Sequence, residues 1–169
     1  MSRGEVEKPP PPISSMGVLL GARSRVTIPS QVRNCIHWLR SAKPPVPCIL
    51  SIGPERQLVV SSSASPFGSQ RRQFFDVLMK RPSIVETAEG HRLARFFAAT
   101  WQRAIQEHFQ LTLPEALTKS WSPDVTAVTL IGFVDTLEIW TPSAWAEEVA
   151  RTARDYEALL DPVLDPSEE

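Results

Sequence analysis

The sequence predicts an α+β fold in which two similar halves build one small β-barrel, because the chain contains an internal repeat. Pro29 and the strand-like segment before it match Pro114 and its preceding segment at an offset of 85 residues. Further along, Ile52-Gly53 matches Ile131-Gly132, and Leu58-Val59-Val60 matches Leu137-Glu138-Ile139, at an offset of 79. One such copy is too small to close a core alone. We therefore expect the two copies to share a barrel about a pseudo-twofold axis.

The same order of strands and helices is predicted for each copy. An alternating strand through Val26 and Ile28 ends at a proline, which the first turn of a helix tolerates because its missing N–H has no partner there. A short helix follows, and two strands joined by a tight turn complete the copy. The apolar face of the first short helix is formed by Val32, Cys35, Ile36 and Leu39. The tight turns are Gly53-Pro54-Glu55-Arg56 and Gly132-Phe133-Val134-Asp135.

Helices are also expected between the copies and after the second copy. Residues 69–80 place Phe74 and Leu78 on one stripe, and residues 88–104 carry apolar residues at helical spacing as far as Trp101 and Ala104. A final helix should begin with Thr141 as N-cap and Pro142 at its first position. Its predicted apolar stripe is Trp145, Val149, Ala153, Tyr156 and Leu160.

These elements divide the chain into five segments. Residues 1–15 should be a disordered Pro-rich tail, and residues 161–169 an acidic tail in which Pro162 and Pro166 stop the helix. The three segments between the tails are the first repeat (16–68), a helical connector (69–104), and the second repeat with the C-terminal helix (105–160).

Charge is distributed unevenly, although the net charge is only -1. Residues 1–103 contain 15 Lys and Arg against 6 Asp and Glu, whereas residues 104–169 contain 3 against 13. Such a split indicates a half that faces a polyanion, or opposite faces that meet between subunits. An ordinary solvated surface is the alternative interpretation.

Composition and motifs argue against several classes of protein. No apolar run approaches the about 18–20 residues of a membrane span, and the polar start is unlike a signal peptide, so we expect a cytoplasmic protein with no membrane partner. Cys35 and Cys48 should be buried, reduced thiols. His37, His91 and His108 lack a carboxylate or Cys at ligand spacing, and no phosphate loop or nucleophile elbow occurs. We therefore expect no catalysis, no metal or other cofactor, and no small-molecule substrate.

A basic stretch identifies the first copy as the candidate binding surface. Residues 20–43 contain no acid, and their cations are Arg23, Arg25, Arg33, Arg40 and Lys43. The planar guanidinium donates two parallel hydrogen bonds, which suits phosphates and the edge of guanine. We expect these five side chains to bind double-stranded DNA, with a solvated helix face as the alternative.

A second group of arginines lies between the copies. Its members are Arg71, Arg72, Arg92 and Arg95. They form either a second basic patch or a subunit interface that binds the acidic second half of a neighbouring chain.

Three segments resemble the MraZ family in order and spacing, over roughly residues 16–150. They are the basic entry Arg23-Ser24-Arg25-Val26-Thr27-Ile28-Pro29, the helix Arg92-Leu93-Ala94-Arg95-Phe96-Phe97, and the run Val128-Thr129-Leu130-Ile131-Gly132, Leu137-Glu138-Ile139-Trp140 and Trp145. The first copy alone also resembles the wider AbrB/SpoVT/MazE group. This resemblance implies two tandem β-α-β units in a swapped-hairpin, double-split barrel, a ring-like homo-oligomer, and repression of transcription by a bacterial, nucleoid-associated protein.

The resemblance also implies a DNA-contact motif of Asp, three residues and Arg in each copy. The corresponding pairs here are Gly21 with Arg25, and Gln106 with Gln110, so the second copy has lost its cation. A further family arginine after the proline is present as Arg33 in the first copy, whereas Thr118 occupies that position in the second.

The leading hypothesis is accordingly a DNA-binding transcriptional repressor that reads DNA through its first repeat. The alternative is an oligomeric protein-interaction module of the same family that no longer binds specific DNA, as the missing Asp and the Gln106/Gln110 pair would favour. A third hypothesis is an AbrB-type antitoxin, with its DNA half in residues 16–60 and an extended toxin-binding part after it.

Overall fold

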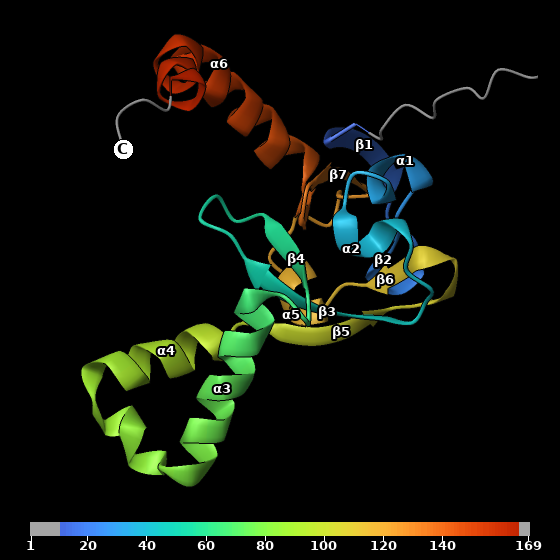
Figure 1. The fold of residues 1–169 in the computed structure, drawn as a ribbon. Coiled ribbons are helices and arrows are strands. Elements are labelled where there is room, and N and C mark those ends of the chain that lie inside the picture. The colour runs from blue at the N-terminus through green and yellow to red at the C-terminus, as the bar shows by residue number, and fades with distance from the viewer. Residues whose placement is uncertain (1–10, 166–169) are drawn as a thin grey trace, which may run out of the picture.

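The computed structural model describes residues 11–165 and has the predicted α+β fold class (Figure 1). Six antiparallel strands form a sheet in the order β1-β7-β8-β4-β3-β5, and β2 pairs with β6 as a separate ribbon. The strands are β1 (Ile13–Leu19), β2 (Arg25–Thr27), β3 (Val46–Ile52), β4 (Leu58–Ser62), β5 (Trp101–Ile105), β6 (Gln110–Thr112), β7 (Ala127–Phe133) and β8 (Thr136–Trp140).

Helices lie around the β-strands and project from them (Figure 1). The α-helices are α1 (Ser30–Arg33), α2 (His37–Arg40), α3 (Pro66–Lys80), α4 (Ala88–Ala98), α5 (Glu115–Thr118) and α6 (Pro142–Leu164), and the 3-10 helices are η1 (Ala22–Ser24), η2 (Pro82–Glu86) and η3 (Glu107–Phe109). Elements α3, η2 and α4, here called the arm (residues 66–98), extend to one side of the β-strands, and α6 extends to another.

The backbone pairing of the two halves follows the offsets found in the sequence. In the ribbon, Val26 lies opposite Leu111. The Ile28 amide donates to the Phe109 carbonyl at 2.9 Å, and the Leu113 amide donates to the Ser24 carbonyl, also at 2.9 Å. The two donors, Ile28 and Leu113, are 85 residues apart in the sequence, and so are the two acceptors, Ser24 and Phe109. In the sheet, Leu58 pairs with Ile139 and Val60 with Leu137, which is the same reciprocal pattern at the offset of 79.

Matching residues of the two halves also fill one hydrophobic core. Five such pairs are buried together: Val26 and Leu111, Ile28 and Leu113, Val32 and Leu117, Leu58 and Leu137, and Val60 and Ile139. Full burial of a Val, Leu or Ile side chain contributes about 1.5–3 kcal/mol. Because each half supplies one member of every pair, neither half has a complete core without the other.

The first short helix differs from the prediction. Its four predicted apolar residues are all buried, but the helix divides into α1 and α2 at Ile36, which is extended (φ -108°, ψ 115°). The division has a tertiary cause, since the His37 amide donates to the Val134 carbonyl at 2.8 Å instead of continuing the helical ladder. Pro29 and Pro114 occupy the N-cap positions of α1 and α5, one residue earlier than predicted.

The predicted helix over residues 88–104 is wrong at its C-terminal end. Helix α4 stops at Ala98, and Trp101–Ile105 form β5, an edge strand of the sheet. Trp101 lies opposite Leu50, and Ala104 lies opposite Pro47. The open edge of β3 supplies this long-range pairing, which overrides the helical spacing of the apolar residues.

The predicted segment ends also need correction. Strand β1 begins at Ile13, inside the predicted tail, whose residues 1–10 lie outside the described range. Helix α3 begins at Pro66, three residues earlier than expected. Helix α6 begins as predicted, with the Thr141 hydroxyl accepting from the Ala144 amide, but it continues through Pro162 to Leu164. Pro162 lacks the helical donor and crowds the carbonyl four residues earlier, and the helix ends two residues after it.

Candidate nucleic-acid interface

The ribbon of β2 and β6 presents its polar face to solvent. Val26 and Leu111 point into the core, and alternation along a strand therefore turns their neighbours outward. On this outer face Arg25 lies opposite Thr112, and Thr27 lies opposite Gln110. Gln110 occupies the position that corresponds to Arg25, so the ribbon carries one cation instead of a symmetric pair.

A tight loop of the same conformation enters each strand of the ribbon. In the first half the Gly21 amide donates to the Arg25 carbonyl at 2.8 Å, and in the second the Gln106 amide donates to the Gln110 carbonyl at 2.8 Å. Each loop holds two consecutive non-glycine residues in the left-handed region, at a cost of about 1–3 kcal/mol each. These residues are Arg23 (φ 58°) and Ser24 (φ 56°), and His108 (φ 59°) and Phe109 (φ 55°).

The two arginines of the first loop are exposed. Arg23 lies in η1 and Arg25 begins β2. Within residues 11–165 neither side chain donates a hydrogen bond or forms an ion pair. Two residues that lie two apart on an extended strand would share one face, but Arg23 and Arg25 do not, because Arg23 is left-handed and belongs to the turn. The backbone of a closed loop, not of a strand, sets the direction of Arg23.

Arg33 has a structural role that spacing did not reveal. Its side chain is half-buried, its Nε donates to the Ile28 carbonyl at 3.1 Å, and its Cζ lies 3.7 Å from the centroid of the Phe109 ring. Arg33 therefore binds the loop of the opposite half. Arg40 and Lys43 are both exposed, and the Arg40 Nε donates to the Asn34 carbonyl at 3.0 Å.

The second loop brings negative charge beside Arg25. A hollow of about 450 Å³ lies against the ribbon, and its lining consists of Arg25, Pro45, Gln106, Glu107, His108, Gln110 and Thr112. The second loop carries the carboxylate of Glu107, whereas the first loop carries Arg23 and Arg25. The two loops thus share a backbone conformation but differ in charge, and the first loop is the one suited to phosphate.

The structure separates the second group of arginines into two pairs. The Arg71 Nε donates to the Thr100 hydroxyl at 2.9 Å, and its guanidinium lies 4.4 Å from the Phe75 ring centroid. Burial lowers the pKa of Arg71 from its usual value. Arg72 donates to the Ser63 carbonyl at 2.6 Å. These two side chains hold the base of the arm, so neither forms a free basic patch.

Arg92 and Arg95 behave differently, because both are exposed on α4. Arg92 lines a hollow of about 390 Å³ together with Ala88, Glu89, Leu93 and Phe96. This surface remains open to a partner.

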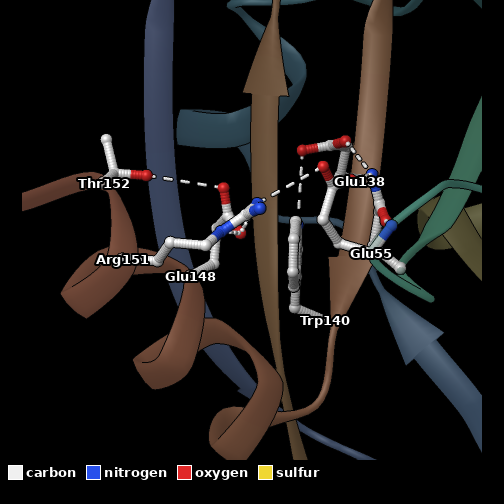
Figure 2. Close-up of polar contacts among 7 residues, drawn as sticks. Glu55, Glu138, Trp140, Glu148, Arg151 and Thr152 are labelled. Carbon is white, nitrogen blue, oxygen red and sulfur yellow. Dashed lines mark hydrogen bonds and ion pairs between the residues drawn. The ribbon is translucent and has the colours of Figure 1, made fainter. Parts of the chain in front are cut away.

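A polar cluster that the sequence did not indicate joins the β3–β4 turn and β8 to α6 (Figure 2). Gln57 is only 5% exposed, and its Nε2 donates to Glu55 at 2.9 Å and to Glu138 at 3.1 Å. The Trp140 indole donates to Glu138 at 3.3 Å. From α6, Arg151 donates to Glu148 and, at 3.4 Å, to Glu55.

This cluster borders a hollow of about 580 Å³ between the β3–β4 turn and α6. Glu148, followed by Glu55, raises the pKa of Arg151. The only sequence signal was Glu138 inside the otherwise apolar Leu137–Trp140 segment, since its partners are far away along the chain. Each of the three carboxylates accepts from a neighbouring donor, and the Arg151–Glu55 contact ties α6 to the β3–β4 turn.

The remaining reactive side chains have ordinary surroundings. His37 Nδ1 lies 3.4 Å from an Asp135 carboxylate oxygen, and both side chains are exposed. Burial raises the pKa of Cys35, and it raises that of Cys48 to about 12. Across residues 11–165 no three or more His, Cys, Asp or Glu side chains are grouped to hold a metal ion.

Comparison of the chain with protein-family models and with curated proteins gives no match. Within the described part of the chain, none of the helices combines the length and the apolar character that crossing a membrane requires. The assignment of a function therefore depends on the chain's own residues.

Proposed function

We propose that this protein is a DNA-binding transcriptional repressor that contacts DNA through the first loop and the start of β2. The observation that carries the proposal is the pair of exposed arginines, Arg23 and Arg25, on a loop closed by the Gly21–Arg25 backbone bond. We further propose that the two halves are tandem AbrB/MraZ-like units in a double-split barrel, which the reciprocal pairings at both offsets support.

The loop suits this function because its backbone is already ordered. Two guanidinium groups on a fixed turn bind phosphate or a guanine edge without the entropy loss of ordering a flexible segment. A good bidentate contact to a base contributes about 1–3 kcal/mol of discrimination. Each phosphate contact releases counterions and makes the affinity salt-dependent.

One basic loop per chain is a small contact, so we propose that the protein acts as a homo-oligomer, arranged as a ring. Several copies on one DNA bind more tightly than one, because each bound loop raises the effective concentration of the next. The second loop of each chain, with Glu107 and Gln110, adds no cation to this contact.

A gel-shift titration against genomic fragments at two salt concentrations tests the proposal. We expect wild type to retain a specific fragment, Arg25→Ala to lose it, and Gln110→Ala, at the matching position, to change little. Unaltered affinity in Arg25→Ala would contradict the assignment of the loop.

One observation favours the alternative, a protein-interaction module without specific DNA binding. Arg33 is engaged by Phe109, and Glu107 lies in the hollow beside Arg25, so fewer cations are free than the sequence predicts. Absence of DNA binding by wild type even at low salt would support this alternative. The antitoxin hypothesis has the least support, since residues 66–164 form helices and strands instead of an extended segment.

A further inference from the structure

Helix α6 carries an apolar stripe that continues beyond the barrel. At its base the Trp145 ring packs against Trp140, with centroids 5.4 Å apart. At about 100° per residue, Val149, Tyr156 and Val163 fall within about 40° of Trp145 on the helix surface. These three side chains and Leu159 are 48–75% exposed. The part of the chain that the structure describes leaves this stripe uncovered.

Acidic residues border the same stripe. Tyr156 lies near the centre of the stripe. Around the helix axis, Asp155 lies about 100° to one side of it and Glu157 about 100° to the other. Helix α6 contains five Asp and Glu residues against two Arg. The stripe is therefore an apolar strip with negative edges, and a stable partner should offer apolar side chains flanked by cations.

The arm of this protein has that complementary chemistry. On α4, Leu93 and Phe96 are nearly half exposed and line the hollow of about 390 Å³. Arg92 and Arg95 lie on the same helix, and residues 66–98 contain six Lys and Arg against three Asp and Glu. Behind this surface the Phe96 ring packs on Phe97 at 5.3 Å, within a cluster that gives the arm a firm base.

The two surfaces of one chain lie far apart. Figure 1 shows α6 and the arm on different sides of the β-strands, and α6 packs mainly against β7. The Trp140–Trp145 contact and the Arg151–Glu55 ion pair hold α6 in this direction. Contact between α6 and an arm therefore requires the arm of a second chain.

We propose that α6 of one copy docks on α4 of the next copy. Tyr156 and Leu159 cover Leu93 and Phe96, and the acids beside the stripe face Arg92 and Arg95. Every chain offers one α6 and one arm, so the contact is head-to-tail and builds a ring or an open chain of copies. The inference rests on the proposed homo-oligomer and does not depend on DNA binding.

Charge reversal tests this contact by light scattering at 10–100 µM protein and low salt. The arm variant is Arg92→Glu with Arg95→Glu, and the helix variant is Asp155→Lys with Glu157→Lys. Each alone places like charges at the contact, so its assembly should weaken at least about tenfold. Mixing the two variants restores opposite charges and should restore assembly. Glu147→Lys, on the opposite face of α6, is the matched control and should assemble like wild type.

The outcomes distinguish a failure of the α6–α4 contact from a failure of the homo-oligomer proposal. A monomeric wild type contradicts both the homo-oligomer and this contact. If wild type assembles and the reversed variants assemble equally well, the homo-oligomer stands and the docking surface is wrong. Thermal melts of each variant establish that it is folded.

Cross-linking decides between this contact and pairing of two α6 helices. Leu159→Cys and Leu93→Cys proteins, when mixed and oxidised, should form disulfides between unlike chains, because both positions are exposed. Disulfides formed mainly between two Leu159→Cys chains would overturn the proposal in favour of α6–α6 pairing.

Discussion

Replacing Arg33 with alanine should destabilise the fold, because this side chain joins the two halves at the loop before β6. Its guanidinium lies 3.7 Å from the Phe109 ring centroid, and its Nε donates to the Ile28 carbonyl at 3.1 Å. A cation–π contact contributes about 0.5–2 kcal/mol and a neutral-acceptor hydrogen bond about 0.5–1.5 kcal/mol. Because Arg33 is half-buried, we expect a total loss near the middle of these ranges, about 2 kcal/mol.

Urea denaturation followed by circular dichroism measures this loss. A double-mutant cycle with Phe109→Leu should return a coupling of about 0.5–2 kcal/mol, since Phe109→Leu removes the ring but keeps an apolar side chain. Arg40→Ala is the matched control: Arg40 is exposed and makes one bond, to the Asn34 carbonyl, so its loss should stay within about 0.5 kcal/mol. The reasoning would be refuted if the stability losses of Arg33→Ala and Phe109→Leu simply added in the double variant. It would also be refuted if the Arg33→Ala protein were as stable as Arg40→Ala.

Three further predictions concern strain, packing and thiol chemistry. His108→Gly should stabilise the fold by about 0.5–1 kcal/mol in denaturant titrations, since His108 is exposed at φ 59° and relief of left-handed strain exceeds the entropy cost of glycine; a loss of stability would contradict this. Gly90→Ala should loosen the arm, because its Cβ would overlap the Ile84 carbonyl oxygen, and hydrogen exchange should quicken in residues 82–98 while the sheet stays protected. The pKa of Cys48 is raised from 9.0 to about 12 by burial, so the unfolded chain ionises first and stability falls as pH rises from 9 toward 12. A Cys48→Ala protein should lose less stability than wild type over this pH range, and native wild type should resist iodoacetamide at pH 8 until it unfolds.

The pairing of the two halves was predictable because it follows a repeated local pattern. Burial forces Val26 and Leu111 into one core, and equal spacing around them fixes which residues face each other. The strand at Trp101–Ile105 was not predictable from local spacing, since the free edge of β3 decides it. Tertiary pairing likewise divides the first short helix at Ile36.

The candidate site was predictable only in part, for a similar reason. Arg23 and Arg25 are exposed, as a basic strand entry predicts, whereas Arg33 is engaged by Phe109 from the other half of the chain. The cluster around Glu55 and Glu138 also joins segments distant in sequence. Contacts of this kind depend on the closed fold, and no spacing within a segment indicates them.

The salt dependence of DNA affinity tests the central claim most directly. On one retained duplex, fluorescence anisotropy gives the slope of log Kd against log salt for wild type and for the Arg23→Gln/Arg25→Gln protein. Each arginine that neutralises a phosphate adds about 0.9 to the slope, so replacing both should reduce it by up to about 1.8 for every chain that binds. The same slope in both proteins would contradict DNA binding through the first loop.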